Sequence, residues 1–525
     1  MTLLLQPSRI QQAVVPRPTY TSSDDESGLE SGPCYSEKSL DDDKPLQSSI
    51  PNDSSDTDLS IAYERFLAGN PEYRTTHAID DLRRTDYKRL ANSGETYVDW
   101  MGGALYPERL VRAHTEFLCT RVLANTHSGS NPSALSHECA SAAREAVLRF
   151  FHAPAEDYTV IFTPNASGAL KLIGEAYPFQ EGGAFVLAAD SHNSVNGIRC
   201  FASAKGADVT YIPSTSQGGL DPEEARTLLA SCSPRGRRPA LLALTAQSNI
   251  SNSKVPLAVA DTAKALGYDV LLDAAALAPT SSLSLAQHPA IDALAVSFYK
   301  MFGYPTGVGA LVARKDLLLR LKRPWFAGGT VDLVQVPGDL VTHAPELHEQ
   351  FEDGTVDYLA LAAVSDGLRL LAVYQPLLPL RLTCLLHYLI AEVQQLRYAG
   401  TNTAVVRVLS RPPKAPGDAG ATASLEFLDP AGVTIPPDSV ARSATRAGIA
   451  LRTGCVCNPG GAAALLSVAT NMAALPPGST HESFEEVVGR ALGVVRISLG
   501  LASNFEDVWR VVKWARGVAE HGVNT

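Results

Sequence analysis

The stretch of sequence that decides the fold is Ile291-Asp292-Ala293-Leu294-Ala295-Val296-Ser297-Phe298-Tyr299-Lys300-Met301-Phe302-Gly303. Its first six residues are mostly apolar and predict a strand that ends shortly before a lysine. A lysine at the end of a buried strand is costly unless it has a partner or a chemical role. A desolvated lysine becomes a nucleophilic amine, which a Schiff base with an aldehyde cofactor requires. Taken alone, Lys300 is more simply explained as a lysine that reaches solvent, and the rest of the chain reverses this interpretation.

Apolar strands alternate with helices on both sides of this stretch. Strands are predicted at residues 158–163, 184–188, 208–212, 240–244, 269–273, 291–296 and 310–313. Helices are predicted at residues 132–151 and 259–266, and others begin at Leu170 and Pro222. This alternation indicates an α/β fold with a mostly parallel central sheet covered on both faces. Such sheets bind ligands at the carboxyl ends of their strands. The polar residues at or just after predicted strand ends are Ser167, His192, Asn249, Asp273 and Lys300.

Three regions of the chain differ in composition. Residues 1–58 hold 11 Asp/Glu against 4 Lys/Arg, with many Ser and Pro, and predict a disordered acidic tail. Residues 59–355 begin with a helical segment at 61–90 and continue into the alternating strands and helices, so they predict a large α/β domain. Residues 356–525 combine a long helical stretch at 358–393 with shorter strands, and predict a smaller α+β domain.

Composition excludes several classes of protein. The net charge of −11 argues against nucleic acid or an anionic membrane as a partner. No apolar run reaches the ~20 residues that span a bilayer, and the N-terminus does not resemble a signal peptide. The 8 cysteines are scattered, so we expect a reduced, cytoplasmic protein without a disulfide framework. Cys455 and Cys457 form a single C-x-C pair, from which no metal site is predicted.

A site for pyridoxal 5′-phosphate (PLP) needs an amine, a carboxylic acid and a group of N–H donors that bind an anion. The sequence offers these three features at the ends of three predicted strands. The ring of this cofactor withdraws electrons only while its nitrogen is protonated, so it needs a carboxylate such as Asp273 beside it. Its phosphate is favoured by backbone N–H groups at a helix N-terminus, and Ala166 and Ser167 precede a predicted helix.

Seven motifs in order carry a resemblance to a known family. They are TPNASGA at 163–169, DSHNSV at 190–195, QSN at 247–249, LDAAA at 272–276, SFYK at 297–300, FEDGT at 351–355 and RTGCVCNPG at 452–460. Over roughly residues 60–515, the chain resembles the class V aminotransferase and cysteine desulfurase family. Within that family it is most similar to the N-terminal domain of eukaryotic molybdenum cofactor sulfurases. The resemblance implies PLP-dependent transferase fold type I.

The resemblance also implies a role for each matching residue. Lys300 would hold PLP covalently, Asp273 would pair with the ring nitrogen and His192 would stack on the ring. The phosphate would be held by Ala166, Ser167, Ser297 and Tyr299, and by Thr355 of a second subunit in a homodimer. Arg452 would bind the carboxylate of an amino-acid substrate, and Asn249, with Gln247, would lie near the cofactor or that carboxylate. Cys457 would carry sulfur as a persulfide, with Cys455 secondary.

Each residue also has a structural interpretation. Asp273 could cap a helix, the serines could serve turns, and both cysteines could be small loop residues. The chain also departs from its family: Ala276 stands where many bacterial desulfurases have a glutamine, and Gly461-Ala462-Ala463 replaces an expected Ala-Cys. Because the chain ends at Thr525, we expect it to be too short for the family's C-terminal molybdenum cofactor domain, and the sulfur acceptor stays open.

Three functions therefore stay under comparison. The first is an L-cysteine desulfurase that releases alanine and keeps the sulfur as a persulfide. The second is a PLP-dependent C–S lyase or other tailoring enzyme that works without a persulfide. The third is a catalytically silent scaffold, which the presence of Lys300, Asp273, His192 and Arg452 argues against. A dinucleotide-binding dehydrogenase is disfavoured because no G-x-G-x-x-G opens a strand–helix unit.

Overall fold

The computed structural model describes residues 53–234, 236 and 238–523. The predicted acidic tail lies almost wholly outside these residues; helix α1 (Asp53–Gly69) takes up its last six positions. The described residues from Ser54 onward form one compact unit.

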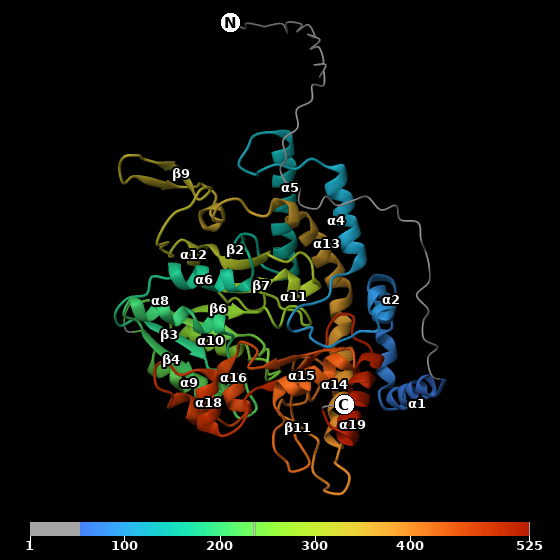
Figure 1. Ribbon diagram of the computed structural model, residues 1–525. Helices are drawn as coiled ribbons and strands as arrows, with labels where there is room; N and C mark the ends of the chain where they lie inside the picture. Colours follow the sequence, from blue (N-terminus) through green and yellow to red (C-terminus); the bar gives the residue numbers. More distant parts are fainter. Residues whose placement is uncertain (1–52, 235, 237, 524–525) are drawn as a thin grey trace, which may run out of the picture. The chain divides into compact units, whose positions relative to one another are not determined.

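A seven-stranded sheet is the centre of the described chain (Figure 1). Its strands are β2 (Tyr158–Thr163), β3 (Ala184–Ala188), β4 (Asp208–Ile212), β5 (Ala240–Thr245), β6 (Asp269–Asp273), β7 (Ala293–Ser297) and β8 (Gly309–Arg314). They follow the order β2-β8-β7-β6-β5-β3-β4, in which β8 alone runs antiparallel to its neighbours. The predicted mostly parallel sheet is therefore confirmed.

Successive side chains of these strands enter two apolar clusters, one on each face of the sheet. In β5, Leu242 and Leu244 belong to one cluster, and Leu241 and Ala243 belong to the other. The first face is covered by α5 (Asn131–Phe150), α9 (Pro222–Ser231), α10 (Ala258–Ala265) and α13 (Tyr358–Tyr374). The second face is covered by α6 (Ala166–Ala176), α8 (Ile198–Ala204) and α12 (Lys315–Leu318).

A second, four-stranded antiparallel sheet lies in the C-terminal part of the described chain. It has the order β11-β12-β15-β14, with β11 (Val406–Val408), β12 (Thr422–Phe427), β14 (Arg452–Gly454) and β15 (Val494–Ser498). Its helices are α15 (Pro437–Arg446), α16 (Pro459–Leu465), α17 (Ala469–Ala473), α18 (His481–Val488) and α19 (Phe505–His521). Strand β14 was not predicted from the sequence, and it places Arg452 at its first position.

The long apolar helix predicted at 358–393 is broken in two. The 3₁₀ turn Gln375–Leu377, which contains Pro376, separates α13 from α14 (Leu378–Gln394), because a proline cannot continue the hydrogen bonds of a helix interior. Length and composition alone would let the stretch Tyr358–Gln394 cross a membrane. However, 56% of its most apolar window is buried within the protein, as in a core helix.

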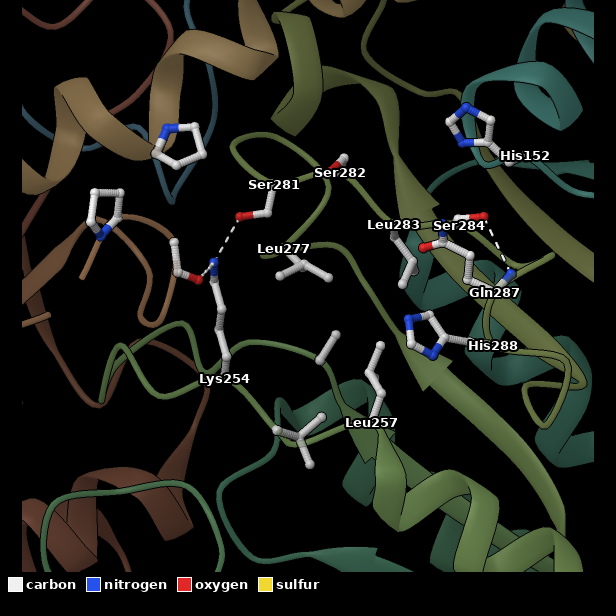
Figure 2. Close-up of a pocket in the computed structure, with 15 residues that line it drawn as sticks. His152, Lys254, Leu257, Leu277, Ser281, Ser282, Leu283, Ser284, Gln287 and His288 are labelled. Atoms are coloured by element: carbon white, nitrogen blue, oxygen red, sulfur yellow. Dashed lines mark hydrogen bonds between the residues drawn. The ribbon is translucent and has the colours of Figure 1, made fainter. Parts of the chain in front are cut away.

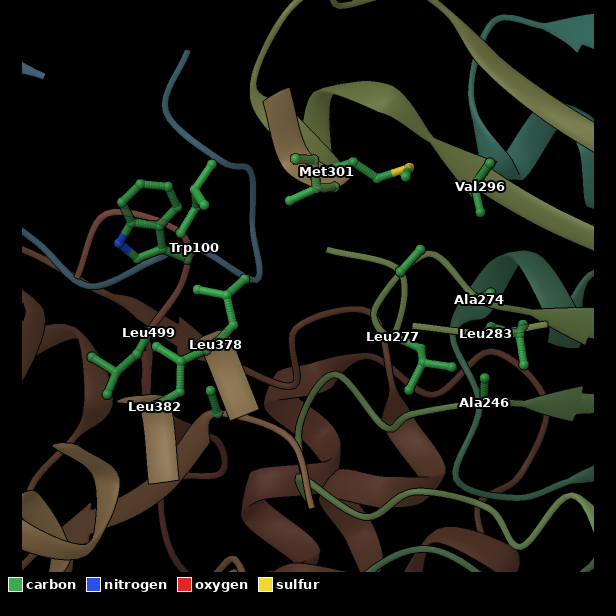
Figure 3. Close-up of a cluster of buried hydrophobic side chains, with 14 of the residues drawn as sticks. Trp100, Ala246, Ala274, Leu277, Leu283, Val296, Met301, Leu378, Leu382 and Leu499 are labelled. Atoms are coloured by element: carbon green, nitrogen blue, oxygen red, sulfur yellow. The ribbon is translucent and has the colours of Figure 1, made fainter. Parts of the chain in front are cut away.

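The N-terminal segment also divides where a helical stretch was predicted at 61–90. Its elements are α1, the 3₁₀ turn Pro71–Thr76, α2 (Ala78–Asp86) and α3 (Lys88–Ser93), followed by β1 (Thr96–Tyr97) and α4 (Glu108–Thr120). Strand β1 pairs with β13 (Ile449–Ala450), and Arg83 forms a 2.8 Å ion pair with Asp507. Figure 3 shows Trp100 in one cluster with Leu378 and Leu499, so this segment packs into the shared core.

Two further pieces complete the described chain. Strands β9 (Val331–Val334) and β10 (Val341–His343) form a separate two-stranded hairpin that projects from the body of the protein (Figure 1), with a 3₁₀ turn at Glu349–Phe351 after it. The short helices α7 (Asn193–Asn196) and α11 (Phe298–Phe302) follow β3 and β7 and carry residues of the candidate site.

Candidate active site

Lys300 lies on α11, directly after β7. Gly303 ends this helix with a φ of +81°, and a Cβ there would lie 2.4 Å from the backbone of Leu105 and Tyr106, so only glycine fits. Burial lowers the pKa of the Lys300 amine; Asp273 opposes this effect, and the positive charges of Arg496 and Arg452 add to it. The sequence-based expectation of a desolvated amine at a strand end is thus matched by the environment of Lys300.

Asp273 and His192 lie at the same edge of the sheet as Lys300. Asp273 is buried at the end of β6, where one carboxylate oxygen accepts a 3.0 Å hydrogen bond from the Ala275 N–H. His192 caps α7, because its Nδ1 accepts the Ser194 N–H at 3.1 Å. An accepting Nδ1 carries no proton, so the neutral ring has its proton on Nε2. Burial lowers the pKa of His192, and the charge of Lys300 lowers it further against the effect of Asp273.

The N-terminus of α6 supplies the polar groups predicted to hold an anion. Asn165 caps this helix by accepting the Gly168 N–H at 3.0 Å, which explains why α6 begins four residues before the predicted start at Leu170. The Ala166 N–H donates to Ser297 Oγ at 2.8 Å, so these two predicted ligands bond each other. The hydroxyl groups of Ser167 and Ser194 lie 2.5 Å apart. Ser194 is a polar neighbour to which the sequence analysis assigned no role.

Thr355 and Tyr299 take different positions around this cradle. Thr355 is exposed, accepts a 3.1 Å hydrogen bond from Asn125 Nδ2, and lines a cavity of about 430 Å³ that Pro164 and Gly168 also line. Tyr299 is half-buried beside Gly103, where an added Cβ would lie 3.4 Å from its ring. Burial raises the pKa of Tyr299, which therefore keeps its phenolic proton.

Arg452 belongs to a chain of three charged groups that the sequence did not reveal. One oxygen of Asp99 accepts 2.9 Å contacts from Nε and Nη2 of Arg452, and the other accepts Nη2 of Arg496 at 2.5 Å. Asp99 and Arg496 are buried, whereas the side chain of Arg452 is 49% exposed. Two guanidinium groups share one carboxylate, so a positive charge is left over at the accessible end, where a substrate carboxylate can bind.

The two candidate cysteines lie on the loop between β14 and α16, and both are exposed. Val456 and Cys457 have φ values of +46° and +60°, a left-handed conformation that is strained for a branched residue such as valine. The Cys457 carbonyl accepts the Asn193 N–H at 2.7 Å, and the Val456 carbonyl accepts Asn249 Nδ2 at 2.7 Å. These bonds fix the backbone of Cys457 against Asn193, the residue that follows His192 in the sequence.

Asp190 is a buried carboxylate that organises this loop. One of its oxygens accepts Ser248 Oγ and Asn458 Nδ2, each at 2.6 Å. The other accepts Ser251 Oγ and the Gly219 N–H, each at 2.7 Å. Asp190 begins the motif at 190–195, but no role for it was predicted from the sequence. Four hydrogen bonds on one carboxylate join the loops after β3, β4 and β5 to the cysteine loop.

Asn249 and Gln247 were predicted to lie near the cofactor or the substrate carboxylate, and the structure shows their amides in contact with other parts of the protein. Asn249 holds the cysteine loop with its amide N–H, while its oxygen accepts Asn458 Nδ2 at 3.0 Å. Gln247 is fully buried with its amide beside Gly420, where a Cβ would lie 2.4 Å from its nitrogen. Asn249 therefore holds the cysteine loop in place through contacts too distant in sequence to anticipate, whereas neither amide atom of Gln247 has a hydrogen-bond partner among the described residues.

Comparisons with known proteins agree with this geometry. The Aminotransferase class-V family model matches residues 96–404, and the chain belongs to this family. It is 32% identical over 472 residues to the molybdenum cofactor sulfurase of Arabidopsis thaliana, covering 83% of this chain and 57% of that protein. Its identity to the molybdenum cofactor sulfurase of Bos taurus is also 32%, covering 82% of this chain and 50% of that protein. The chain thus spans about half the length of these curated relatives.

Solved structures confirm the fold. The cysteine desulfurase of Thermococcus onnurineus NA1 superposes with a TM-score of 0.68 at 21% identity, covering 84% of this chain and 98% of that one. The predicted PLP-dependent transferase fold type I is therefore confirmed.

Proposed function

We propose that this protein is a PLP-dependent cysteine desulfurase that takes sulfur from L-cysteine and holds it as a persulfide on Cys457. The observation that carries the proposal is the 2.7 Å hydrogen bond from the Asn193 N–H to the Cys457 carbonyl. This bond fixes the backbone of Cys457 next to α7, the helix that His192 caps. Lys300 and Asp273 act on the pKa of His192, and Cys457 is among the groups that act on the pKa of Lys300. A nucleophilic thiol, a desolvated amine and a buried acid thus belong to one site.

The residues present fit PLP. Within the described chain, neither Lys300 nor Asp273 has an ion-pair partner, so an amine and a carboxylate are both available to a cofactor. Asp273 would pair with the ring nitrogen, His192 would cover the ring, and Ser167 would contact the phosphate with the N-terminal N–H groups of α6. When bound, PLP withdraws electrons from the substrate Cα.

The protein's own residues then perform the remaining work. Arg452 binds the substrate carboxylate, and the Lys300 amine, whose pKa burial lowers, accepts the proton from Cα. The Cys457 thiolate attacks the substrate sulfur, so an S–S bond forms as the C–S bond breaks. The electron pair of the C–S bond stays on Cβ and takes up a proton. The products are alanine and a persulfide on Cys457, and atoms and electrons balance.

The proposal extends to a homodimer in which Thr355 of one subunit approaches the phosphate of the other. Its support is the exposure of Thr355 next to Pro164 and Gly168, on a surface that a second chain can reach. The proposal assigns no sulfur acceptor. The relatives are named molybdenum cofactor sulfurases, but this chain matches only about half of their length.

Two experiments test the assignment. Borohydride reduction of the holoenzyme followed by peptide mapping places a pyridoxyl group on Lys300; a label on another lysine contradicts the site. L-cysteine turnover is then compared in Cys457→Ala and the matched control Cys455→Ala, with the persulfide trapped by alkylation. Cys457→Ala loses both turnover and persulfide, whereas Cys455→Ala keeps most of both. Sulfide release at the parent rate by Cys457→Ala would instead identify a lyase that works without a persulfide.

A further inference from the structure

A second cavity, separate from the candidate active site, opens beside Lys254 (Figure 2). It encloses about 510 Å³, a volume typical of sites for small organic molecules. We call it the Lys254 cavity. The residues that line it include Lys254, Ser281, Ser282, Ser284, Gln287, His152 and His288, together with apolar side chains.

The position of Lys254 is fixed by two loops. Gln247 and Lys254 pair as an antiparallel bridge, so the lysine sits on one arm of a tight hairpin after β5. Its ammonium group donates to Ser281 Oγ at 2.9 Å and to the Gly417 carbonyl at 2.7 Å. Figure 2 shows both bonds on one side of the cavity. An ammonium has three N–H donors, and the third has no partner among the described residues.

The charge of Lys254 is only weakly compensated. No aspartate or glutamate is among the residues that line the cavity, and within the described chain no carboxylate forms an ion pair with Lys254. Burial lowers its pKa to about 8, against the weaker opposing effect of Asp418. With that pKa the group is still about nine-tenths protonated at neutral pH. An anion at this position would relieve the cost of a buried, unpaired charge.

The rest of the wall combines polar residues with a patch of apolar side chains. Leu257, Leu277 and Leu283 lie between Lys254 and His288 in Figure 2. Pro379 and Pro416 add apolar surface. One cation beside an apolar wall suits a molecule with one anionic group on an apolar body.

We propose that the Lys254 cavity binds a small organic anion, with its carboxylate or phosphate against the Lys254 ammonium and its apolar body against Leu257, Leu277 and Leu283. The site shares no lining residue with the pocket that contains Lys300, so the proposal does not depend on the proposed desulfurase activity.

Amine footprinting of the PLP-loaded protein tests this proposal. Trace acetylation with acetic anhydride at mildly alkaline pH, followed by peptide mapping, gives the labelling rate of each lysine. At a concentration about ten times its Kd, phenyl phosphate occupies most sites and lowers the rate at Lys254 about tenfold. The rate at the exposed Lys88 stays unchanged. Benzyl alcohol, which lacks the charge, gives no protection.

Comparing two anions in the same experiment identifies the anionic group that the Lys254 cavity prefers. Stronger protection by benzoate than by phenyl phosphate assigns a carboxylate ligand, and the reverse assigns a phosphate. Equal labelling of Lys254 with and without both anions overturns the proposal, as does equal protection by benzyl alcohol. By calorimetry, Lys254→Met loses the binding of the effective anion, whereas Lys88→Met retains it. Unchanged binding by Lys254→Met also overturns the proposal.

Discussion

Replacing Asp190 by asparagine tests whether this carboxylate holds the cysteine loop. The carboxylate accepts four hydrogen bonds, two on each oxygen. Asparagine keeps one accepting oxygen and puts an N–H₂ group in place of the other. Each oxygen of Asp190 accepts one serine hydroxyl and one N–H group. Whichever oxygen the N–H₂ group replaces, the serine hydroxyl can rotate and accept from it. The N–H donor at that position, on Gly219 or Asn458, is left without a partner.

The cost follows from those lost bonds. One buried unpaired donor costs about 1–3 kcal/mol, and the charged character of the remaining bonds is lost as well. We therefore expect Asp190→Asn to lower the free energy of unfolding by about 2–4 kcal/mol. L-cysteine turnover should fall in the PLP-loaded variant, because residue 190 then holds Asn458, next to Cys457, and the neighbouring loops less firmly.

Urea denaturation followed by far-ultraviolet circular dichroism measures the stability of both forms. The matched control is Asp208→Asn at an exposed strand position, which should change stability by no more than about 0.5 kcal/mol. If Asp190→Asn is as stable and as active as the parent, the reasoning about this carboxylate is wrong.

Three further predictions concern the site itself. Arg452→Lys should raise KM for L-cysteine about tenfold with a smaller change in kcat, because lysine cannot copy the planar contact with a carboxylate; an unchanged KM would contradict this. Asp273→Asn should bind PLP and lower kcat by about a hundredfold or more, measured by absorbance and alanine release, since a neutral amide does not hold the ring proton. For His192, the folded pKa lies below the ordinary value of about 6.5, so the unfolded state binds the extra proton and stability falls as pH drops below that value. His192→Gln should flatten this loss in urea denaturation between about pH 6.5 and 5, and an equally steep loss would contradict the assignment.

The sequence predicted the large sheet well because its physical signal is local. Strands β2, β3, β4 and β6 begin and end at the predicted residues, since each is a short apolar run between turn residues. The convergence of His192, Asp273 and Lys300 was also predictable, because the carboxyl ends of parallel strands meet at one edge of a sheet.

Other features depend on contacts between distant parts of the chain, and local patterns do not encode those. Asp99 lies 353 residues from Arg452 and 397 from Arg496, yet it joins the two. Ser297 was expected to bind a phosphate, but its hydroxyl accepts the first N–H of α6, a partner 131 residues away. The break between α13 and α14 did have a local signal, Pro376, which the apolar periodicity on either side obscured.

The most direct test of the proposed function is the product formed from L-cysteine in a single turnover. The PLP-loaded protein is mixed with substoichiometric L-cysteine, quenched with an alkylating agent and analysed by mass spectrometry. The proposed mechanism predicts one alanine for each persulfide, with the persulfide on the peptide that contains Cys457. Pyruvate and free sulfide with an unmodified Cys457 would contradict it and identify an eliminating lyase.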